Sequence, residues 1–260
     1  MHIPKLSIVL PTYKRPKLLH RCLESIYLNL GVNVQIVVVD DSDGGEGFDI
    51  CQKYSVTYIR KSIYDRRGLA GSRNIGLKYC IGDFIAFIDD DDFLATSHLL
   101  DMVNNAEGAD FIYGNYFEFN DGALKSIEIG SVGVSELLVS NRLPVGSFVI
   151  KRDKIRYNFD EELRSHEDWD FLLKNIYKLN LSQLNLFPVV IDKTNNTSSS
   201  HQARTRSYFW LDFLAIYARF PCPELAVKRS AMLETLGLNI PANSLLMEPY
   251  LNQRNFNDVI

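Results

Sequence analysis

Short apolar runs alternate with amphipathic segments along the first half of the chain. The runs at residues 6–10, 32–40, 56–60 and 83–88 are rich in β-branched and aliphatic side chains, and such runs are typical of buried strands. From about Pro16, apolar positions recur at helical spacing. Strands that alternate with helices at this spacing predict an α/β fold with a mainly parallel sheet flanked by helices.

The second half of the chain is less regular. Three further strands are expected, over residues 109–119, 145–152 and 185–192. Four helices are expected, over residues 68–80, where a loop of small residues runs into the helix, and over 166–179, 208–220 and 223–236. No repeat or low-complexity linker marks a boundary. We therefore expect one α/β domain over residues 1–206 and a helical C-terminal extension over residues 207–260.

The composition excludes several classes of protein. The chain has 260 residues, of which 46% are hydrophobic and 23% are charged, with a net charge of −4 and a pI of about 5.8. This composition excludes a disordered chain. The negative net charge means that the protein as a whole has no positive field to attract nucleic acid. No apolar run reaches the roughly 18 residues of a membrane-spanning helix, and the N-terminus lacks the anatomy of a signal peptide. We expect a cytoplasmic protein without a nucleic-acid partner.

Four consecutive aspartates, Asp89 to Asp92, follow the predicted strand at residues 83–88. Two carboxylates about 4 Å apart repel each other by ~4 kcal/mol at an effective dielectric constant of about 20, so this run needs a cation, a proton or free access to water. Ligands bind at the carboxyl ends of strands in open parallel sheets, and hard divalent ions prefer oxygen ligands. The run therefore predicts an Mg²⁺ or Mn²⁺ site. A solvated acidic turn that caps the next helix is the alternative.

A second acidic pair, Asp40 and Asp41, ends the run at residues 32–40. Two strands of one sheet therefore end in acids, and both ends are expected at the same edge. A carboxylate there can accept hydrogen bonds from a base N–H group or from ribose hydroxyls. A helix cap or a turn is the structural alternative.

Glu167 and Asp168 lie at the start of the predicted helix 166–179. Acids in the first turn stabilise the helix dipole, but a carboxylate there can also act as a general base toward an incoming hydroxyl. Two cationic candidates lie elsewhere in the chain. Arg73 follows small residues and could pair with a diphosphate. His201 lies in a polar segment over residues 194–207, which we expect to form a loop, and it could complete a metal shell.

The segment from residue 208 combines aromatic side chains with few charges. Its aromatic residues are Tyr208, Phe209, Trp210, Phe213 and Tyr217. A helix of this kind is typical of a protein core, which is the interpretation we favour. If the same residues were exposed, they would provide peripheral contact with a membrane.

Five motifs, in order, resemble those of family 2 glycosyltransferases with the GT-A fold. They are SIVLPTYKRPKLLHRCLESI, VVVDDSD, GLAGSRNIGL, FIAFIDDDDF and HEDWDF, and they cover about residues 5–180. The resemblance implies a GT-A-type mixed, mainly parallel sheet in a catalytic domain over residues 1–206. Within it, the nucleotide-binding half would span about residues 1–95 and the acceptor half about residues 96–206. The resemblance also implies inverting sugar transfer from a nucleotide-diphosphate sugar, with Mn²⁺ or Mg²⁺ as cofactor.

The resemblance also implies roles for individual residues of this chain. The nucleotide-sugar site would contain Pro11, Thr12, Tyr13, Arg15, Asp41, Arg73, Asp89 and Asp90. The divalent ion would be bound by Asp91, Asp89 and His201, and Asp168 would be the catalytic base with Glu167 supporting it. Asp90 departs from the family pattern, in which a small or polar residue stands between the two acids.

The implied reaction is the addition of a single sugar. The chain lacks the Gln-x-x-Arg-Trp motif and the membrane spans of processive polysaccharide synthases. The donor base is expected to be uracil, with guanine or thymine left open, and the donor sugar and the oligomeric state are not indicated. The acceptor would be a glycan or lipid-linked hydroxyl in surface-polysaccharide synthesis, with peripheral contact at the inner face of the membrane. A metal-dependent phosphohydrolase and an inactive nucleotide-sugar- or glycan-binding module are the alternatives.

Overall fold

The computed structural model describes residues 5–30, 34–62, 64–65, 68–194 and 207–246. Its main sheet contains, in spatial order, β3 (Thr57–Arg60), β2 (Gln35–Asp40), β1 (Leu6–Thr12), β4 (Phe84–Phe87), β8 (Phe148–Lys151), β5 (Phe111–Tyr113) and β9 (Leu181–Gln183). All pairings in this sheet are parallel except those of β8, which is antiparallel to both neighbours. This arrangement confirms the predicted α/β fold with a mainly parallel sheet.

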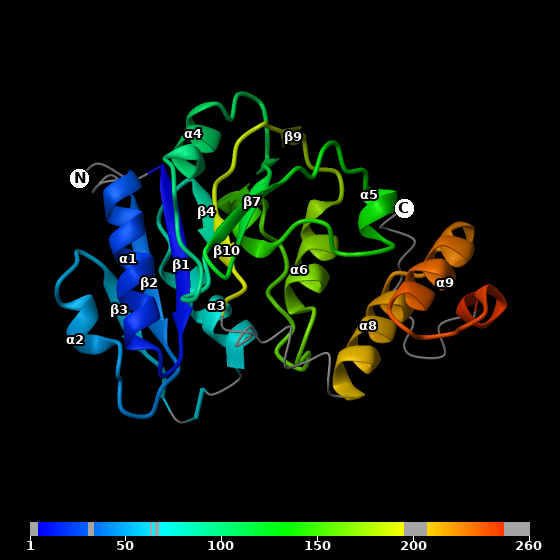
Figure 1. Ribbon diagram of the computed structural model, residues 1–260, viewed down its shortest axis with the longest axis horizontal. Helices are drawn as coiled ribbons and strands as arrows, with labels where there is room; N and C mark the ends of the chain where they lie inside the picture. The colour runs from blue at the N-terminus through cyan, green and yellow to red at the C-terminus, as the bar shows by residue number, and fades with distance from the viewer. Residues whose placement is uncertain (1–4, 31–33, 63, 66–67, 195–206, 247–260) are drawn as a thin grey trace.

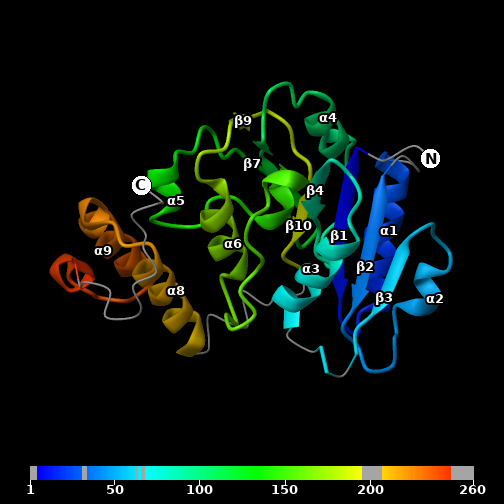
Figure 2. The ribbon, with the colours of Figure 1, turned by 180° about the vertical axis from the view of Figure 1, so that it is seen from behind.

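Helices cover both faces of the sheet. The helices are α1 (Pro16–Leu30), α2 (Phe48–Cys51), α3 (Gly68–Tyr79), α4 (His98–Asn104), α5 (Val134–Leu137), α6 (Glu167–Ile176), α8 (Ser207–Arg219) and α9 (Ala226–Thr235), with 3₁₀ turns η1 (Val145–Ser147), η2 (Arg152–Lys154), η3 (Pro223–Leu225) and η4 (Ala242–Leu246). α1 and α3 lie on opposite faces of the sheet (Figures 1 and 2). The short helices α2, α4 and α5 were not predicted from the sequence.

The alternation of side chains along β1 explains why both faces need a helix. Ile8 packs in the apolar cluster that contains the buried face of α1, whereas Val9 packs in the cluster on the α3 side. α3 includes Gly68, so the small residues at the start of the segment 68–80 are helical and do not form the loop that we expected. A Cβ atom at Gly76 would lie only 2.4 Å from Val9 Cγ1, so glycine at this position allows the close approach of α3 to β1.

A second sheet contains three strands. They are, in order, β10 (Val190–Asp192), β6 (Tyr116–Asn120) and β7 (Ala123–Ile127). β6 is parallel to β10 and antiparallel to β7. A β-bridge between Phe93 and Val190 joins this sheet to the segment that follows β4. The bridge brings β10 beside the run of four aspartates.

The prediction of one strand over residues 109–119 is wrong, because the chain changes sheets after Tyr113. β5 ends there, and β6 begins in the second sheet. Gly114 lies at this crossing, where a Cβ atom would come within 2.5 Å of Leu186 O. Only glycine permits such a close passage of two backbones. Apolar and polar residues continue to alternate across the crossing, so the sequence pattern does not show where the chain changes sheets.

Two other strand predictions extend too far toward the N-terminus. In the segment 145–152, Val145–Ser147 form the 3₁₀ turn η1, only Phe148–Lys151 pair as a strand, and Arg152 begins η2. In the segment 185–192, only Val190–Asp192 belong to a strand. Pro188 precedes it and has no N–H group to donate to a sheet.

At the end of the molecule opposite to β3, α8 packs on α6, and α9 packs on the end of α8 and on the residue that follows α5 (Figure 1). Phe213 of α8 lies with its ring centroid 4.9 Å from that of Trp169 in α6, and Arg229 of α9 donates hydrogen bonds to the carbonyl oxygens of Leu138 and Phe220. Phe209, Phe213 and Tyr217 are buried, which confirms the core interpretation for these three aromatic residues. Among the described residues, no helix is both long and apolar enough to span a bilayer.

We expect Phe213→Ala to lower the free energy of unfolding by about 3–5 kcal/mol, because it removes a buried aromatic side chain and leaves a cavity. Leu211 lies on the same helix but is 65% exposed, so Leu211→Ala is the matched control, with an effect within about 0.5 kcal/mol. Urea unfolding followed by circular dichroism measures both. Equal midpoints for the two variants would contradict the packing of α8 described here.

Candidate active site

A cleft of about 950 Å³ opens at the carboxyl ends of β1 and β4. These strands are parallel neighbours. The chain leads from β1 to β2 toward one edge of the sheet and from β4 to β5 toward the other edge, and open α/β sheets bind ligands at such a point. The cleft is lined by all described residues that the sequence predicted for the site: Pro11, Thr12, Tyr13, Arg15, Asp41, Arg73, Asp89, Asp90, Asp91, Glu167 and Asp168. His201 lies outside the described residues.

Three of the four consecutive aspartates form a cluster of carboxylates. Asp89, Asp91 and Asp92 each place one oxygen within 4.8 Å of the others. Burial, together with the neighbouring carboxylates, raises the pKa of Asp91 and Asp92 above the ordinary value. The backbone N–H of Asp192 in β10 donates to Asp92 at 3.1 Å. The alternative of a solvated acidic turn is wrong, because Asp92 is buried and α4 begins only at His98.

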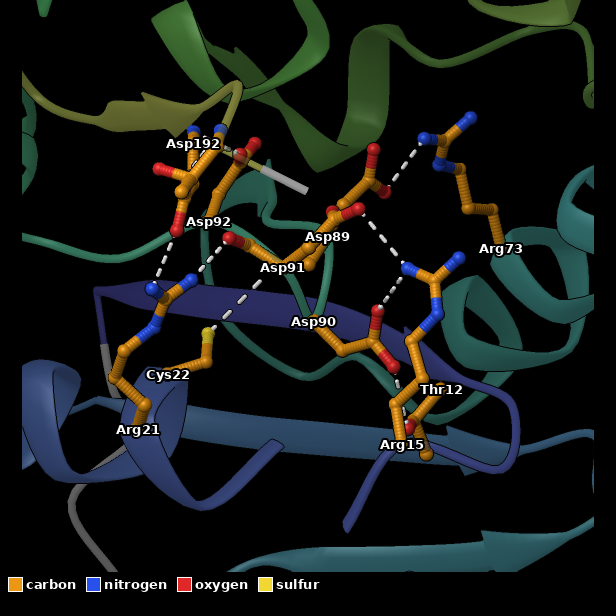
Figure 3. Close-up of polar contacts among 11 residues, drawn as sticks. Thr12, Arg15, Arg21, Cys22, Arg73, Asp89, Asp90, Asp91, Asp92 and Asp192 are labelled. Atoms are coloured by element: carbon orange, nitrogen blue, oxygen red, sulfur yellow. Dashed lines mark hydrogen bonds and ion pairs between the residues drawn. The ribbon is translucent and has the colours of Figure 1, made fainter. Parts of the chain in front are cut away.

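Asp90, the residue that departs from the family pattern, connects the acidic run to β1. Thr12 Oγ1 donates to Asp90 Oδ2 at 2.7 Å, and the Arg15 guanidinium lies 3.2 Å from Asp90 Oδ1 and 2.9 Å from Asp91 Oδ2. Figure 3 shows Arg15 and Arg21 beside the run of aspartates. Burial raises the pKa of Asp90 to about 7, although Thr12 and Arg15 oppose this rise. The additional acid therefore joins the ends of β1 and β4.

Arg73 of α3 joins the acidic run to the start of α6. Its side chain is 2% exposed, and it donates to Asp89 Oδ1 at 2.7 Å and to Glu167 Oε1 at 2.8 Å. The guanidinium carbon also lies 5.3 Å from the centre of the Phe159 ring. Burial alone would lower the pKa of Arg73, but the Asp89 and Glu167 carboxylates raise it above its usual value. The sequence did not indicate that this arginine lies between two carboxylates.

Asp168 is held at the first turn of α6 by two hydrogen bonds. Asn141 Nδ2 donates to Asp168 Oδ2 at 3.0 Å, and the backbone N–H of Trp169 donates to Asp168 Oδ1 at 2.8 Å. The N–H of Leu143 donates to Asn141 Oδ1 at 3.1 Å, which fixes the orientation of the Asn141 amide. Burial raises the pKa of Asp168, and Arg73 opposes this rise. Sequence analysis missed Asn141, since it belongs to no recognisable motif.

The two acids at the end of β2 have different positions. Asp40 is fully buried and accepts hydrogen bonds from the backbone N–H of Gly47 and from the Tyr58 hydroxyl, so it stabilises the loop after β2. Asp41 lines the cleft, and Lys61 Nζ lies 3.0 Å from its Oδ1. Only one member of the pair is therefore available to a ligand. The sequence contained no signal that marked Lys61.

Residues 7–132 match the sequence model of glycosyl transferase family 2. An uncharacterized glycosyltransferase of Haemophilus influenzae is 31% identical to this chain over 182 residues, which are 65% of this chain and 61% of that protein. Residues 7–132 of this chain therefore carry a glycosyl transferase family 2 domain. The match confirms the resemblance to this family that the five motifs predicted.

A second relative is named for a specific transfer reaction. The GalNAc(5)-diNAcBac-PP-undecaprenol beta-1,3-glucosyltransferase of Campylobacter jejuni is 30% identical over 128 residues, which are 47% of this chain and 41% of that protein. The chain thus spans less than two thirds of the length of either of these two relatives.

Two solved structures share the fold of this chain. TarS 1–349 of S. aureus in complex with UDP-GlcNAc has a TM-score of 0.66 at 20% identity, and the match covers 97% of this chain and 73% of that one. The mannosyltransferase PcManGT of Pyrobaculum calidifontis, in complex with GDP-Man and Mn²⁺, has a TM-score of 0.63 at 15% identity, with coverage of 95% and 79%. These likenesses confirm the GT-A-type fold.

Proposed function

We propose that this chain is an inverting glycosyltransferase that moves a single sugar from a nucleoside-diphosphate sugar to an acceptor hydroxyl. One observation carries the proposal. Arg73 bridges Asp89 of the acidic run and Glu167 at the start of α6, so the run and Asp168 line one cleft. A site for a diphosphate and a site for a base thus lie side by side, as sugar transfer to a hydroxyl requires.

The nucleotide would lie at the β1–β2 side of the cleft. Pro11, Thr12 and Tyr13 line the cleft at the end of β1, and Asp41 lines it at the end of β2. We propose that Asp41 accepts a hydrogen bond from the base, and that the donor is a UDP-sugar carrying a hexose or an N-acetylhexosamine. The UDP-GlcNAc in the TarS structure supports UDP, whereas the GDP-Man in PcManGT keeps guanine as an alternative.

A divalent ion fits the acidic cluster. Asp89, Asp91 and Asp92 present three carboxylates with oxygens within 4.8 Å of one another, which is the type of ligand that Mg²⁺ and Mn²⁺ prefer. We propose that these residues, with Asp91 as the main ligand, hold the ion. When bound, the ion supplies positive charge that stabilises the leaving diphosphate. The Mn²⁺ in PcManGT supports this assignment. The role of His201 as a further ligand remains a proposal.

Asp168 would act as the general base. Its carboxylate would take the proton of the acceptor hydroxyl while the hydroxyl oxygen attacks the anomeric carbon. The attack comes from the face opposite the leaving group, the bond from the anomeric carbon to the diphosphate oxygen breaks, and the nucleoside diphosphate departs. Glu167 would keep Arg73 in position, and Arg73 would orient Asp89 in turn.

We propose that the acceptor is a glycan or a lipid-linked saccharide in surface-polysaccharide synthesis. The name of the Campylobacter jejuni relative contains an undecaprenol-linked saccharide, which supports a lipid-linked acceptor. The reaction would then take place in the cytoplasm, with peripheral contact at the inner face of the membrane. A phosphohydrolase is not favoured, since residues 7–132 match the model of a glycosyltransferase family.

A binding experiment followed by a turnover experiment tests the proposal. The melting temperature of the wild-type protein is measured with UDP, GDP, CDP and TDP, each with and without Mn²⁺. We expect metal-dependent stabilisation by one diphosphate, and then turnover of the corresponding nucleotide sugars. Stabilisation by none of the four would overturn the proposal. Binding without turnover of any donor would favour the inactive binding module.

Asn141→Ala is expected to move the acid limb of the pH profile of kcat/KM to higher pH. The Asn141 amide donates to the Asp168 carboxylate and favours its charged form, so its removal raises the pKa of Asp168 further. Because the base must be ionised, kcat/KM falls by up to about tenfold on the acid side of the profile, and the loss becomes smaller as the pH rises. The exposed Asn104 provides the control variant, Asn104→Ala. An unshifted limb would argue against Asp168 as the base.

A further inference from the structure

Lys61 is a fully buried lysine that lies behind Asp41. It follows β3, and its side chain has no exposed surface. Its ammonium nitrogen lies 3.0 Å from Asp41 Oδ1, 3.2 Å from Ser72 Oγ and 3.4 Å from the carbonyl oxygen of Gly68. The ammonium group thus donates to Ser72 and Gly68, and its charge is paired with that of Asp41. Lys61 therefore reaches a ligand in the cleft only through Asp41.

The ion pair determines what Asp41 can offer to a ligand. Its Oδ1 atom is enclosed, and its short contact with Lys61 is an ion pair rather than a well-aligned hydrogen bond. The Asp41 side chain is 15% exposed and borders the cleft, as do Pro11, Thr12 and Tyr13. A buried charge is tolerated only when it is paired. Lys61 thus holds Oδ1 of Asp41 and leaves Oδ2 as the carboxylate oxygen that can accept hydrogen bonds from a ligand.

We propose that Lys61 is a positioning residue that makes Asp41 select the base of the donor nucleotide. A carboxylate favours bases that have a ring N–H donor on their Watson–Crick edge. These bases are uracil and thymine, which have the donor at N3, and guanine, which has it at N1. It disfavours cytosine, whose N3 is an acceptor, and adenine, whose N1 is an acceptor, because two acceptors would face each other. This inference rests on the proposed function, since it assigns the base-binding role to Asp41.

The size of the selection follows from the cost of an unsatisfied acceptor. A buried polar group left without its partner weakens binding by about 10- to 100-fold, so we expect UDP or GDP to bind at least tenfold more tightly than CDP. Without Lys61, no ion pair holds the Asp41 carboxylate in the orientation that presents an acceptor to the base. The preference against CDP should then shrink.

The test compares nucleotide preference among lysine variants. Dissociation constants of UDP, GDP and CDP are measured by titration calorimetry, in Mn²⁺, for wild type, Lys61→Gln, Lys61→Met and Lys61→Arg. Lys53 is exposed, so Lys53→Met is the matched control. We expect the Gln and Met variants to bind the preferred diphosphate at least about tenfold more weakly than wild type. The ratio of the affinity for this diphosphate to the affinity for CDP should fall toward one. Lys61→Arg should retain the ratio.

The ratio separates base selection from a purely structural role of the lysine. Loss of packing lowers all three affinities together and leaves their ratio unchanged. Lys61→Gln keeps N–H donors for Ser72 and Gly68. The affinity ratio can therefore be measured on this variant if Lys61→Met does not fold. An unchanged ratio in the folded Gln variant, or a wild type that prefers CDP, would overturn the inference while leaving the proposed sugar transfer intact. A wild type that binds no diphosphate would instead contradict the proposed function itself.

Discussion

Asp168→Asn is expected to lower kcat by about 10²- to 10⁴-fold, which is the range over which a positioned general base accelerates proton transfer. The amide has the shape of the carboxylate but cannot take the proton of the acceptor hydroxyl. Asp168 accepts one hydrogen bond at each carboxylate oxygen, from Asn141 and from the backbone N–H of Trp169, so the amide keeps one of these two bonds at unchanged side-chain volume. We therefore expect the dissociation constant of the nucleoside diphosphate to change less than about threefold.

The measurement is steady-state sugar transfer together with diphosphate titration of the same variant. Asp153→Asn is the matched control, because Asp153 is exposed in the 3₁₀ turn η2. The control should keep wild-type kcat. If Asp168→Asn retained more than a tenth of the wild-type kcat while folded, Asp168 would not be the base. An equal loss in kcat and in diphosphate affinity would assign it to binding instead.

Asp91→Ala is expected to abolish metal-dependent stabilisation by the nucleoside diphosphate and to reduce transfer by about 10³-fold or more. Asp91 belongs to the cluster of three carboxylates that fits the ion, and the substitution removes one of them. It also removes the contact of Arg15 with Asp91 Oδ2, although Arg15 still contacts Asp90. The protein should therefore stay folded while it loses the coupling between Mn²⁺ and the nucleotide.

Thermal unfolding with and without Mn²⁺ and UDP measures this coupling directly. Wild type and Asp153→Ala should both show a shift in melting temperature that needs the metal and the nucleotide together. Asp91→Ala should show none, and its melting temperature without ligands should be unchanged or higher, because one repelling carboxylate has been removed. A variant that retained the full metal-dependent shift would place the ion elsewhere in the cleft.

The order of elements in the first half of the chain was predictable because it depends on local patterns. The apolar runs at residues 6–10, 32–40, 56–60 and 83–88 became the four parallel strands β1 to β4. Their alternation with amphipathic helices leads to a parallel sheet, and parallel strands end at one edge. Acids at two strand ends were therefore expected near each other, and Asp41 and Asp89 do line the same cleft.

The second half was less predictable because its strands are short and change sheets. β5 and β6 are separated by two residues, so the hydrophobic pattern continues through the crossing at Gly114. The crossing depends on the close passage of the segment around Leu186, which is about 70 residues away in the sequence. Local periodicity contains no information on such an approach.

The sequence by itself determined the fold class, the family and the residue types that line the cleft, because strand ends and motif spacings are properties of short segments. Only the tertiary structure decided which side chains act on one another. Arg73 and Glu167 are 94 positions apart, yet they form an ion pair, and neither Asn141 nor Lys61 belongs to a recognisable motif. Such contacts arise when helices and loops pack on both faces of the sheet. They determine which carboxylates are charged, and hence the chemistry that the cleft can perform.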